Sequence, residues 1–251
     1  MEATSYLLED QVESDHWWFR GRRVLFGRLL RRLGIKPDSR VLDAGTSSGS
    51  NLRLLRDLNF TNYCGIEISD EAIAICRRKG LGPVERGDIC NIPFEGQSFD
   101  FVFATDVIEH VERDDAALAE VRRVLVPGGY CLVTVPAFPS LWGHQDVVSH
   151  HLRRYRAAKV LALVREAGLT PVSWHHFNYL LFLPIWCARQ LLNLLSPRPQ
   201  SENRLNTPLI NTVLQAIFLF DVLTAPILKP GFGVSFLVIC QRPAADQEPI
   251  R

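Results

Sequence analysis

Residues Val41–Asn51 read VLDAGTSSGSN, a short apolar run with an aspartate and two glycines that leads into a segment with helical spacing. A strand that passes through a glycine-bearing turn into a helix is how a nucleotide-binding loop begins. We expect Gly45 to let a ligand approach the backbone and Gly49 to let the turn enter the helix closely. The loop alone does not identify the nucleotide, because several unrelated chemistries use it.

Apolar strands and amphipathic helices alternate along the chain from this loop onward. Strands are predicted at 40–45, 63–69, 83–88, 98–106 and 130–136, and helices at 50–58, 71–80, 113–129 and 155–168. Apolar strands joined through helices form a parallel sheet covered on both faces, so we predict a doubly wound α/β fold. The ligand of such a sheet lies at the carboxyl ends of the strands, where the strand order reverses.

The N-terminal segment departs from this alternation. Residues 1–15 are acidic and are expected to be loosely ordered, whereas residues 16–34 predict a helix that ends at Gly34. We therefore expect residues 1–37 to form a helical cap and residues 38–251 to form one α/β domain.

The C-terminal part is interrupted by an apolar stretch. Strands are predicted at 170–180 and 233–243, and residues from about 180 to 229 between them are mostly apolar, with a polar turn at 197–206. We interpret this stretch as a helical insertion before the last strand.

Composition and charge exclude some function classes. The net charge is +1, so the chain as a whole is not an electrostatic binder of nucleic acid. Its six cysteines are scattered, with no C-x-x-C pair. With no secretory signal at the N-terminus, this pattern predicts a reducing cytoplasm.

Polar residues follow each predicted strand at the ligand-facing edge. Glu67 ends the second strand, 22 residues after Gly45, where a carboxylate can accept hydrogen bonds from both ribose hydroxyls. Asp88 ends the third strand, placed for an exocyclic amine. The fourth strand ends in a polar cluster formed by Thr105, Asp106, Glu109 and His110.

These motifs, in this order, resemble the class I S-adenosylmethionine-dependent methyltransferases. The similarity covers residues 38–136 and includes VLDAGTSSG, GIEIS, GDI, FDFVFATDVIEHV and EVRRVLVPGGYCLVTVP. The N-terminal HWWFRGRR and the later LWGHQD and HHLRRYR resemble a bacterial subgroup of these enzymes, of the small-molecule or lipid type.

The resemblance implies a seven-stranded, mostly parallel, Rossmann-like sheet whose last strand, GVSFLVICQR, is antiparallel. It implies S-adenosylmethionine as the cofactor. Glu67 would then bind the ribose, Asp88 and Ile89 the adenine, and Asp43, Gly45 and Asp106 the methionine portion. Thr46, Gly49 and Ile68 complete the implied cofactor-binding set.

Methyl transfer from a sulfonium is an in-line displacement, which the enzyme promotes by alignment and by exclusion of water. A hydroxyl acceptor also benefits from a general base, usually histidine near neutral pH. His110 is one candidate, and His144 with Asp146 as its partner is another. No metal site is predicted, because no cysteine or regular ligand spacing supports one.

Two other functions fit part of the sequence. AGTSSGSN and YRAAK (Tyr155 to Lys159) resemble the loop and the Y-x-x-x-K motif of short-chain dehydrogenases. That family's third glycine is replaced by Asn51, however, and the fourth strand does not end in an N-N-A-G-like turn. The other alternative is a methyltransferase-like binding protein that has lost activity.

The apolar insertion bears on the acceptor. Residues 209–228 are nearly long enough to span a bilayer, but a central Asp221 disfavours a spanning helix. A helical lid over the active-site mouth and an interfacial element at a membrane surface, formed by residues 180–228, both remain open. Trp17–Phe19 are expected either to anchor the first helix in the core or to form part of a lid over the cofactor. Either role of the insertion predicts a bulky hydrophobic or lipid-linked acceptor, while the oligomeric state stays open.

Overall fold

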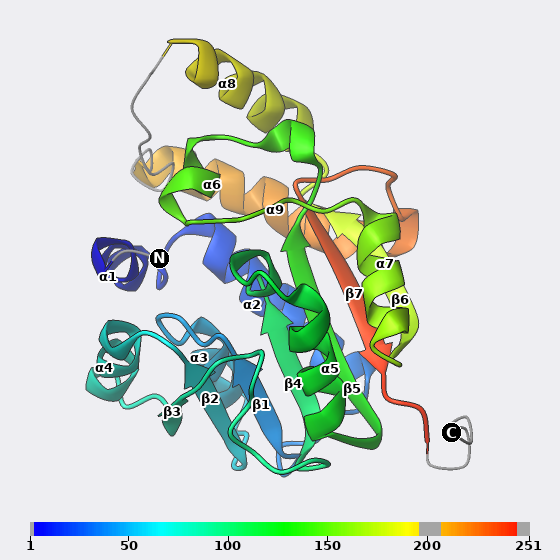
Figure 1. Ribbon diagram of the computed structural model, residues 1–251. Helices are drawn as coiled ribbons and strands as arrows, with labels where there is room; N and C mark the ends of the chain where they lie inside the picture. Colours follow the sequence, from blue (N-terminus) through cyan, green and yellow to red (C-terminus); the bar gives the residue numbers. More distant parts are fainter. Residues whose placement is uncertain (1–2, 196–206, 245–251) are drawn as a thin grey trace.

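The computed structural model describes residues 3–195 and 207–244. Its core is a seven-stranded sheet in the order β3-β2-β1-β4-β5-β7-β6 (Figure 1). The strands are β1 Val41–Ala44, β2 Tyr63–Glu67, β3 Val84–Arg86, β4 Phe99–Thr105, β5 Leu125–Pro136, β6 Thr170–Phe177 and β7 Ser235–Gln241. The first five are parallel and β7 runs antiparallel between β5 and β6, which confirms the predicted sheet.

Helices cover both faces of this sheet. On one face, α5 (Asp114–Val124) and α7 (Ala157–Glu166) pack on β4, β5 and β7. On the other face lie α2 (Trp17–Arg32), α3 (Ser50–Asp57) and α9 (Pro208–Leu228). The strands are apolar throughout because both of their faces are buried. Ser69 caps α4 (Asp70–Arg78), because its hydroxyl accepts a hydrogen bond from the Ala72 amide.

The N-terminal segment is more ordered than its composition suggested. The expectation of a loosely ordered start was wrong, because Ala3–Val12 form helix α1. Tyr6 is buried against Ala72 and Ile75 of α4, so this aromatic side chain anchors the helix. The acidic side chains of α1 also have partners in the loop after β1, described below.

The helix predicted at 113–129 ends earlier. α5 stops at Val124 and Leu125 pairs with Phe99 of β4, so the prediction was wrong for residues 125–129. Pro127 cannot continue a helix. Any side chain at position 129 would lie within 3.1 Å of the Asp100 carbonyl, so this stretch approaches β4 closely.

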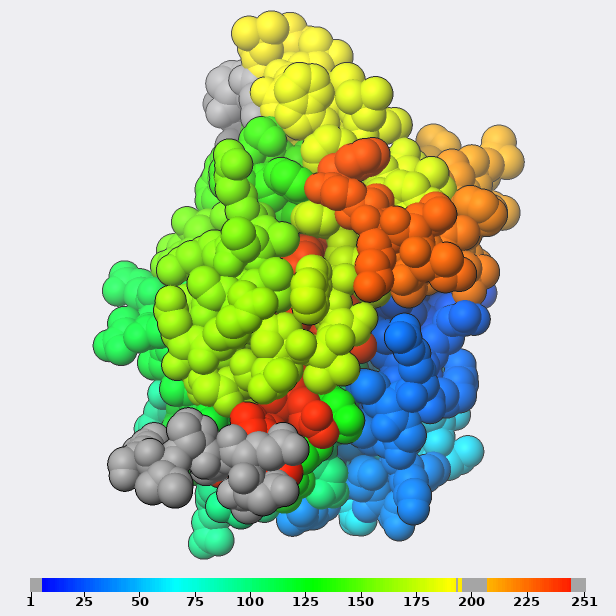
Figure 2. Space-filling view, turned by 90° about the vertical axis from the view of Figure 1, so that its right-hand side faces the viewer, coloured from blue at the N-terminus to red at the C-terminus, as the bar shows by residue number. Residues whose placement is uncertain are grey.

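The insertion lies between β6 and β7, as predicted. It consists of α8 (Phe182–Leu195) and α9, and the polar turn predicted at 197–206 lies outside the described residues. Figure 2 shows α8 in yellow, standing above the body of the molecule. α9 is instead part of the core, since Phe218 is fully buried against the rings of Trp17 and Trp18. Trp17 and Trp18 are therefore anchors of the core, and they also line the larger cavity described below.

Candidate active site

The strand order reverses between β1 and β4, and the candidate site lies at the carboxyl ends of these two strands. Two cavities meet there, a smaller one of about 230 Å³ and a larger one of about 290 Å³. Both are lined by Gly45, Ser47, Asp106 and His110. The two cavities are thus adjacent compartments of one site.

The glycine loop is held against the end of β2. The amides of Gly45 and Thr46 both donate to the Ile66 carbonyl, at 3.0 Å. Gly45 has a φ of +80°, and a Cβ there would lie 2.4 Å from Cγ2 of Val107. The protein's own packing therefore requires glycine at this position, and the approach of a ligand to its backbone stays a prediction. Gly49 has a φ of +93° and begins α3, so it shapes the turn without lining either cavity.

Asp43 lies behind the loop. Its side chain is fully buried and accepts a hydrogen bond from Asn51 Nδ2 at 2.8 Å, while Asn51 also donates to Thr105. Burial raises the pKa of Asp43 to about 7, against the opposing effect of the Asn51 hydrogen bond. Asp43 is absent from the lining of both cavities, so it braces the ends of β1 and β4 through Asn51.

The smaller cavity contains the predicted nucleoside-binding residues. Glu67, Ile68, Asp88 and Ile89 line it, and Tyr6 of α1 closes it. Glu67 Oε2 accepts the Ser47 amide at 2.8 Å, and Oε1 accepts the amides of Ile68 and Ser69. A carboxylate offers about four lone-pair sites, so one remains for a ribose hydroxyl. These residues fit an adenosine group.

Helix α1 closes the site through a set of acidic side chains. Glu9 accepts a hydrogen bond from the Ser47 hydroxyl at 2.7 Å, and Glu13 accepts one from Ser48 at 2.6 Å. Burial raises the pKa of Glu9, against the opposing effect of the Ser47 hydrogen bond. The sequence pattern did not identify these residues as part of the site, because an acidic N-terminal segment is also typical of a solvent-exposed tail.

The larger cavity lies between α2, α6 (His144–Val148) and α8. One wall is aromatic, formed by Trp17, Trp18 and Phe19, and Ile185 and Val234 add aliphatic surface. Much of the rest of the lining is polar. Polar lining residues include Glu9, Arg22, Glu109, His110, His151, Arg154 and Arg189.

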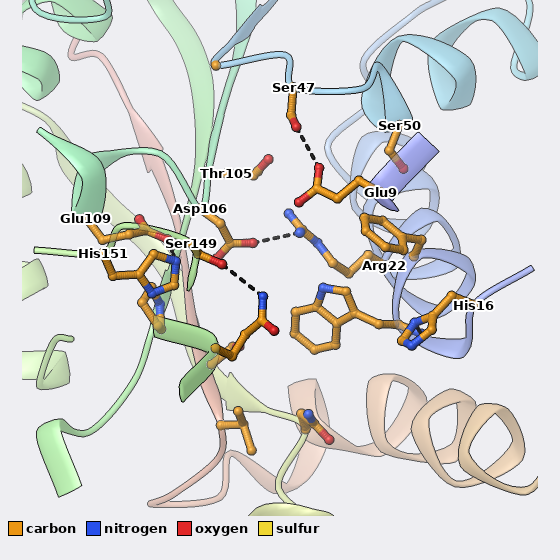
Figure 3. A pocket seen from close by; sticks show the side chains of 18 of the residues that line it. Glu9, His16, Arg22, Ser47, Ser50, Thr105, Asp106, Glu109, Ser149 and His151 are labelled. Carbon is orange, nitrogen blue, oxygen red and sulfur yellow. Dashed lines mark hydrogen bonds and ion pairs between the residues drawn. The ribbon is translucent and has the colours of Figure 1, made fainter. Parts of the chain in front are cut away.

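Arg22 crosses the larger cavity and joins its two sides. Its Nη1 lies 2.7 Å from Asp106 Oδ2, and its guanidinium lies over the rings of Trp18 and Phe26. Figure 3 shows Arg22 reaching Asp106 from the side of Glu9, with Glu109 and His151 on the opposite side. Asp106 has a φ of +51°, in the left-handed region that few non-glycine residues adopt. Residues 20–36 contain seven basic residues and no acidic one, and nothing in this part of the sequence distinguishes Arg22 from the other six.

The predicted pair of His144 and Asp146 was wrong. Asp146 is fully buried, and its partner is His151, with Nδ1 at 2.8 Å from Asp146 Oδ1. Burial favours the neutral form of Asp146, but the hydrogen bond from His151 and the charges of Arg154 and Arg189 outweigh it and lower the pKa to about 2. His144 is not among the residues that line the two cavities. Residues in a loop can pair in several ways, so spacing alone could not identify the partner.

His110 does reach the site, as predicted. It follows β4 in the short 3₁₀ helix Ile108–His110 (η1) and lines both cavities. Burial and the adjacent His151 lower the pKa of His110 to about 3. His110 is therefore a neutral imidazole near pH 7 and a weak base. Its role as a general base stays a prediction.

The neighbouring Glu109 is completely buried. Burial and the charge of Asp106 raise the pKa of Glu109 well above its ordinary range. Neither of its carboxylate oxygens has a hydrogen-bond partner among the described residues.

Tyr155 has no place in this site. Its ring is buried, and its hydroxyl donates to Asp114 at 2.9 Å and to the Ile108 carbonyl at 3.2 Å. A dehydrogenase would need that hydroxyl to face the substrate. The Y-x-x-x-K pattern is therefore explained by packing at the start of α7.

Sequence comparisons agree with this geometry. Residues 42–133 match the family described as Methyltransferase domain. Sterol 24-C-methyltransferase of Schizosaccharomyces pombe is 34% identical over 108 residues, which are 40% of this chain and 29% of that protein. Phthiotriol/phenolphthiotriol dimycocerosates methyltransferase 1 of Mycobacterium ulcerans is 39% identical over 100 residues, 38% of this chain and 36% of that protein.

A Mycolicibacterium smegmatis protein named "Probable S-adenosylmethionine-dependent methyltransferase" is 29% identical over 160 residues, 62% of this chain and 61% of that protein. The chain thus spans between 29% and 61% of the lengths of these three relatives.

Solved structures share the fold over most of the chain. A Haloferax volcanii protein that forms a complex with the Trm112 methyltransferase activator has a TM-score of 0.65 at 19% identity, covering 98% of this chain and 97% of that one. Phosphoethanolamine N-methyltransferase 2 of Haemonchus contortus, bound to S-adenosyl-L-methionine, has a TM-score of 0.57 at 17% identity, covering 93% of this chain and 57% of that one. Together the comparisons confirm the predicted resemblance, the Rossmann-like fold and S-adenosylmethionine as the cofactor.

Proposed function

We propose that this chain, whose methyltransferase domain belongs to the class I S-adenosylmethionine-dependent family, methylates a bulky hydrophobic or lipid-linked acceptor. One observation carries the proposal: a second cavity with an aromatic wall adjoins the nucleoside cavity and shares Gly45, Ser47, Asp106 and His110 with it. The acceptor in the larger cavity would then face the methyl group across these shared residues.

The residues of the chain supply alignment and exclusion of water. The cofactor, when bound, supplies an activated methyl group on its sulfonium. Glu67 and Asp88 hold the nucleoside end, and the loop at Gly45 brings the reactive end to the border between the cavities. Trp17 and Trp18 hold the apolar body of the acceptor, so that its nucleophilic atom points toward Glu109, His110 and His151. Such positioning can contribute about 7–11 kcal/mol to a bimolecular reaction.

Two kinds of support favour a lipid-like acceptor. The names of the Schizosaccharomyces pombe and Mycobacterium ulcerans relatives give a sterol and phthiotriol or phenolphthiotriol dimycocerosates as what those enzymes methylate. The aromatic wall of the larger cavity suits an acceptor with a large apolar body.

We further propose that the insertion contacts a membrane surface from which the acceptor enters. Leu194 and Ile227 are exposed to 82% and 81%, and other large apolar residues of α8 and α9 are exposed with them. α9 is also the one helix in the described ranges that is long and apolar enough to cross a membrane. One side of α9 is fixed to the protein, however, since Asp221 is buried and accepts the amides of Asn178, Tyr179 and Leu180. An interfacial position fits a helix with one packed side and one exposed apolar side.

The methylation is tested with radiolabelled S-adenosylmethionine and fractionated lipid and small-molecule extracts of the host, followed by mass spectrometry of the labelled product. We expect label in an apolar fraction, and S-adenosylhomocysteine should suppress it. Label confined to polar fractions would contradict the lipid acceptor, and no label in any fraction with cofactor bound would favour an inactive binding protein.

Membrane contact is tested by flotation with vesicles of phosphatidylcholine and phosphatidylglycerol. We expect the double variant Leu194→Glu/Ile227→Glu to bind at least about 10-fold more weakly, because each buried apolar side chain contributes roughly 1.5–3 kcal/mol. Val172→Glu is the control, since Val172 is an exposed apolar residue on β6, outside the insertion. Equal vesicle binding by all three proteins would rule out the proposed contact.

A further inference from the structure

Three metal-ligating side chains converge where the two cavities meet. Glu109 and His110 belong to η1, and His151 follows α6, so two separate segments supply them. One ligand atom from each residue lies within 4.8 Å of the other two. Glu109 Oε1 lies 4.0 Å from His151 Nε2, and the two imidazole rings are 4.8 Å apart.

The buried carboxylate of Glu109 can bind a cation in this cluster, because no hydrogen bond uses its oxygens among the described residues. Glu109 is fully buried, and both of its oxygens lack a hydrogen-bond partner among the described residues. A buried polar group without a partner costs several kcal/mol, so such groups are rare in folded proteins. A bound cation would supply the missing partner for both oxygens.

His151 is oriented as a metal ligand usually is. Its Nδ1 is hydrogen-bonded to Asp146, which is itself held by the Gly143 amide at 2.9 Å and by Arg154 Nε at 2.8 Å. A carboxylate on one ring nitrogen fixes the tautomer and leaves the other nitrogen to bind the ion. Nε2 of His151 is on the side of Glu109. The chain thus provides an outer partner for one ligand as well as the ligands themselves.

We propose that Glu109, His110 and His151 bind one divalent first-row transition-metal ion at the border of the two cavities. Two imidazoles and one carboxylate are the protein ligands of many zinc and iron sites that keep open positions for water or substrate. The site differs from the prediction of no metal, because its ligands are brought together by the fold and not by sequence spacing.

A catalytic role for this ion rests on the proposed methyl transfer, whereas the proposal that the ion binds does not. His110 and His151 line the larger cavity, so an open coordination position there can take an acceptor hydroxyl. Coordination lowers the pKa of the hydroxyl, which releases its proton to water. The oxygen then forms a bond to the methyl carbon as the carbon–sulfur bond breaks, giving a methyl ether and S-adenosylhomocysteine, while the metal keeps its oxidation state.

The test measures metal binding directly, without cofactor or acceptor. The full chain is treated with a chelator, dialysed and titrated by calorimetry with Zn²⁺ and, separately, with Mn²⁺. We expect one ion per chain, and we expect Glu109→Gln and His151→Ala to weaken binding of the tighter ion at least about 10-fold to 100-fold. His144→Ala, a histidine replacement seven residues before His151, should bind as the wild-type chain does.

A second measurement does not depend on how the variants fold. The wild-type chain loaded with one equivalent of Cu²⁺ should give an electron paramagnetic resonance spectrum with hyperfine coupling to two imidazole nitrogens. No binding of Zn²⁺ or Mn²⁺ by the wild-type chain, equal loss in His144→Ala, or a Cu²⁺ spectrum without nitrogen coupling would each overturn the site. None of these outcomes affects the methyl-transfer assay, so the two proposals can fail separately.

Discussion

The two sides of the active site are built in different ways. The cofactor side consists of short loops at the ends of β1, β2 and β4, and backbone hydrogen bonds fix them to the ends of neighbouring strands, as from Gly45 and Thr46 to Ile66. The acceptor side is assembled from α1, α2, α6 and the insertion, through side chains far apart in the chain, such as Arg22 with Asp106 and Trp18 with Phe218. A loop at a strand end leaves a recognisable pattern in the sequence, whereas contacts between side chains far apart in the chain do not. Enzymes of one class can therefore share a cofactor side and differ in their acceptor sides.

Gly45→Ala should have the largest effect and should act on the cofactor side. The new methyl group would clash with Val107 and would require a disfavoured φ of +80°, so we expect about 3 kcal/mol of lost stability. Affinity for S-adenosylmethionine should fall about 100-fold if the loop shifts by that energy. Calorimetry and thermal melting measure the two effects.

Gly34→Ala is the matched control. Gly34 also has a positive φ, of +69°, but nothing lies within 4 Å of a Cβ there. This variant should lose about 1 kcal/mol and keep its cofactor affinity. Similar losses of affinity in both variants would contradict the role given to the loop.

Asp221→Asn should act on the acceptor side and leave the cofactor side intact. The buried carboxylate accepts three backbone amides at the start of the insertion, and an amide group can replace only part of these bonds. We expect the free energy of unfolding, measured in urea, to fall by about 2 kcal/mol with unchanged S-adenosylmethionine affinity. Asp57→Asn, at an exposed aspartate of α3, should change stability by less than about 0.5 kcal/mol. A loss of cofactor affinity in Asp221→Asn would show that the two sides are not independent.

Asp43→Asn should act on the pH dependence of stability. Burial raises the pKa of Asp43 to about 7, above its ordinary value of 3.8, so the folded state binds this proton more tightly than the unfolded state. This contribution to stability is complete below about pH 3.8 and is lost as pH rises to about 7. Between about pH 5 and about pH 8 the wild-type chain should therefore lose stability relative to Asp43→Asn, whereas other buried groups such as Glu9 and His110 titrate alike in both proteins. Thermal melting of both proteins across this range measures the difference. Parallel pH profiles would mean that Asp43 does not titrate in this range.

The sequence placed Gly45, Glu67 and Asp88 at one edge of the sheet, where they line the smaller cavity. It could do so because apolar strands, a glycine turn and acids at strand ends are each recognised within a short stretch of sequence. The sequence failed where the path of a loop or the packing of separate segments decides the partner. It paired Asp146 with His144 rather than with His151, and it assigned no structure to α1, whose order depends on Tyr6 packing against α4. Glu109 lay in a recognised motif, but only the fold places it beside His151.

The central claim is that the cofactor side binds S-adenosylmethionine through Glu67, and calorimetric titration tests it most directly. We predict one cofactor per chain in the wild-type protein and at least about 10-fold weaker binding in Glu67→Gln, which loses charge-assisted hydrogen bonds worth about 1.5–3 kcal/mol. Glu85→Gln, at an exposed carboxylate on β3, should bind as the wild-type chain does. No binding by the wild-type chain, or equal binding by Glu67→Gln, would contradict the account.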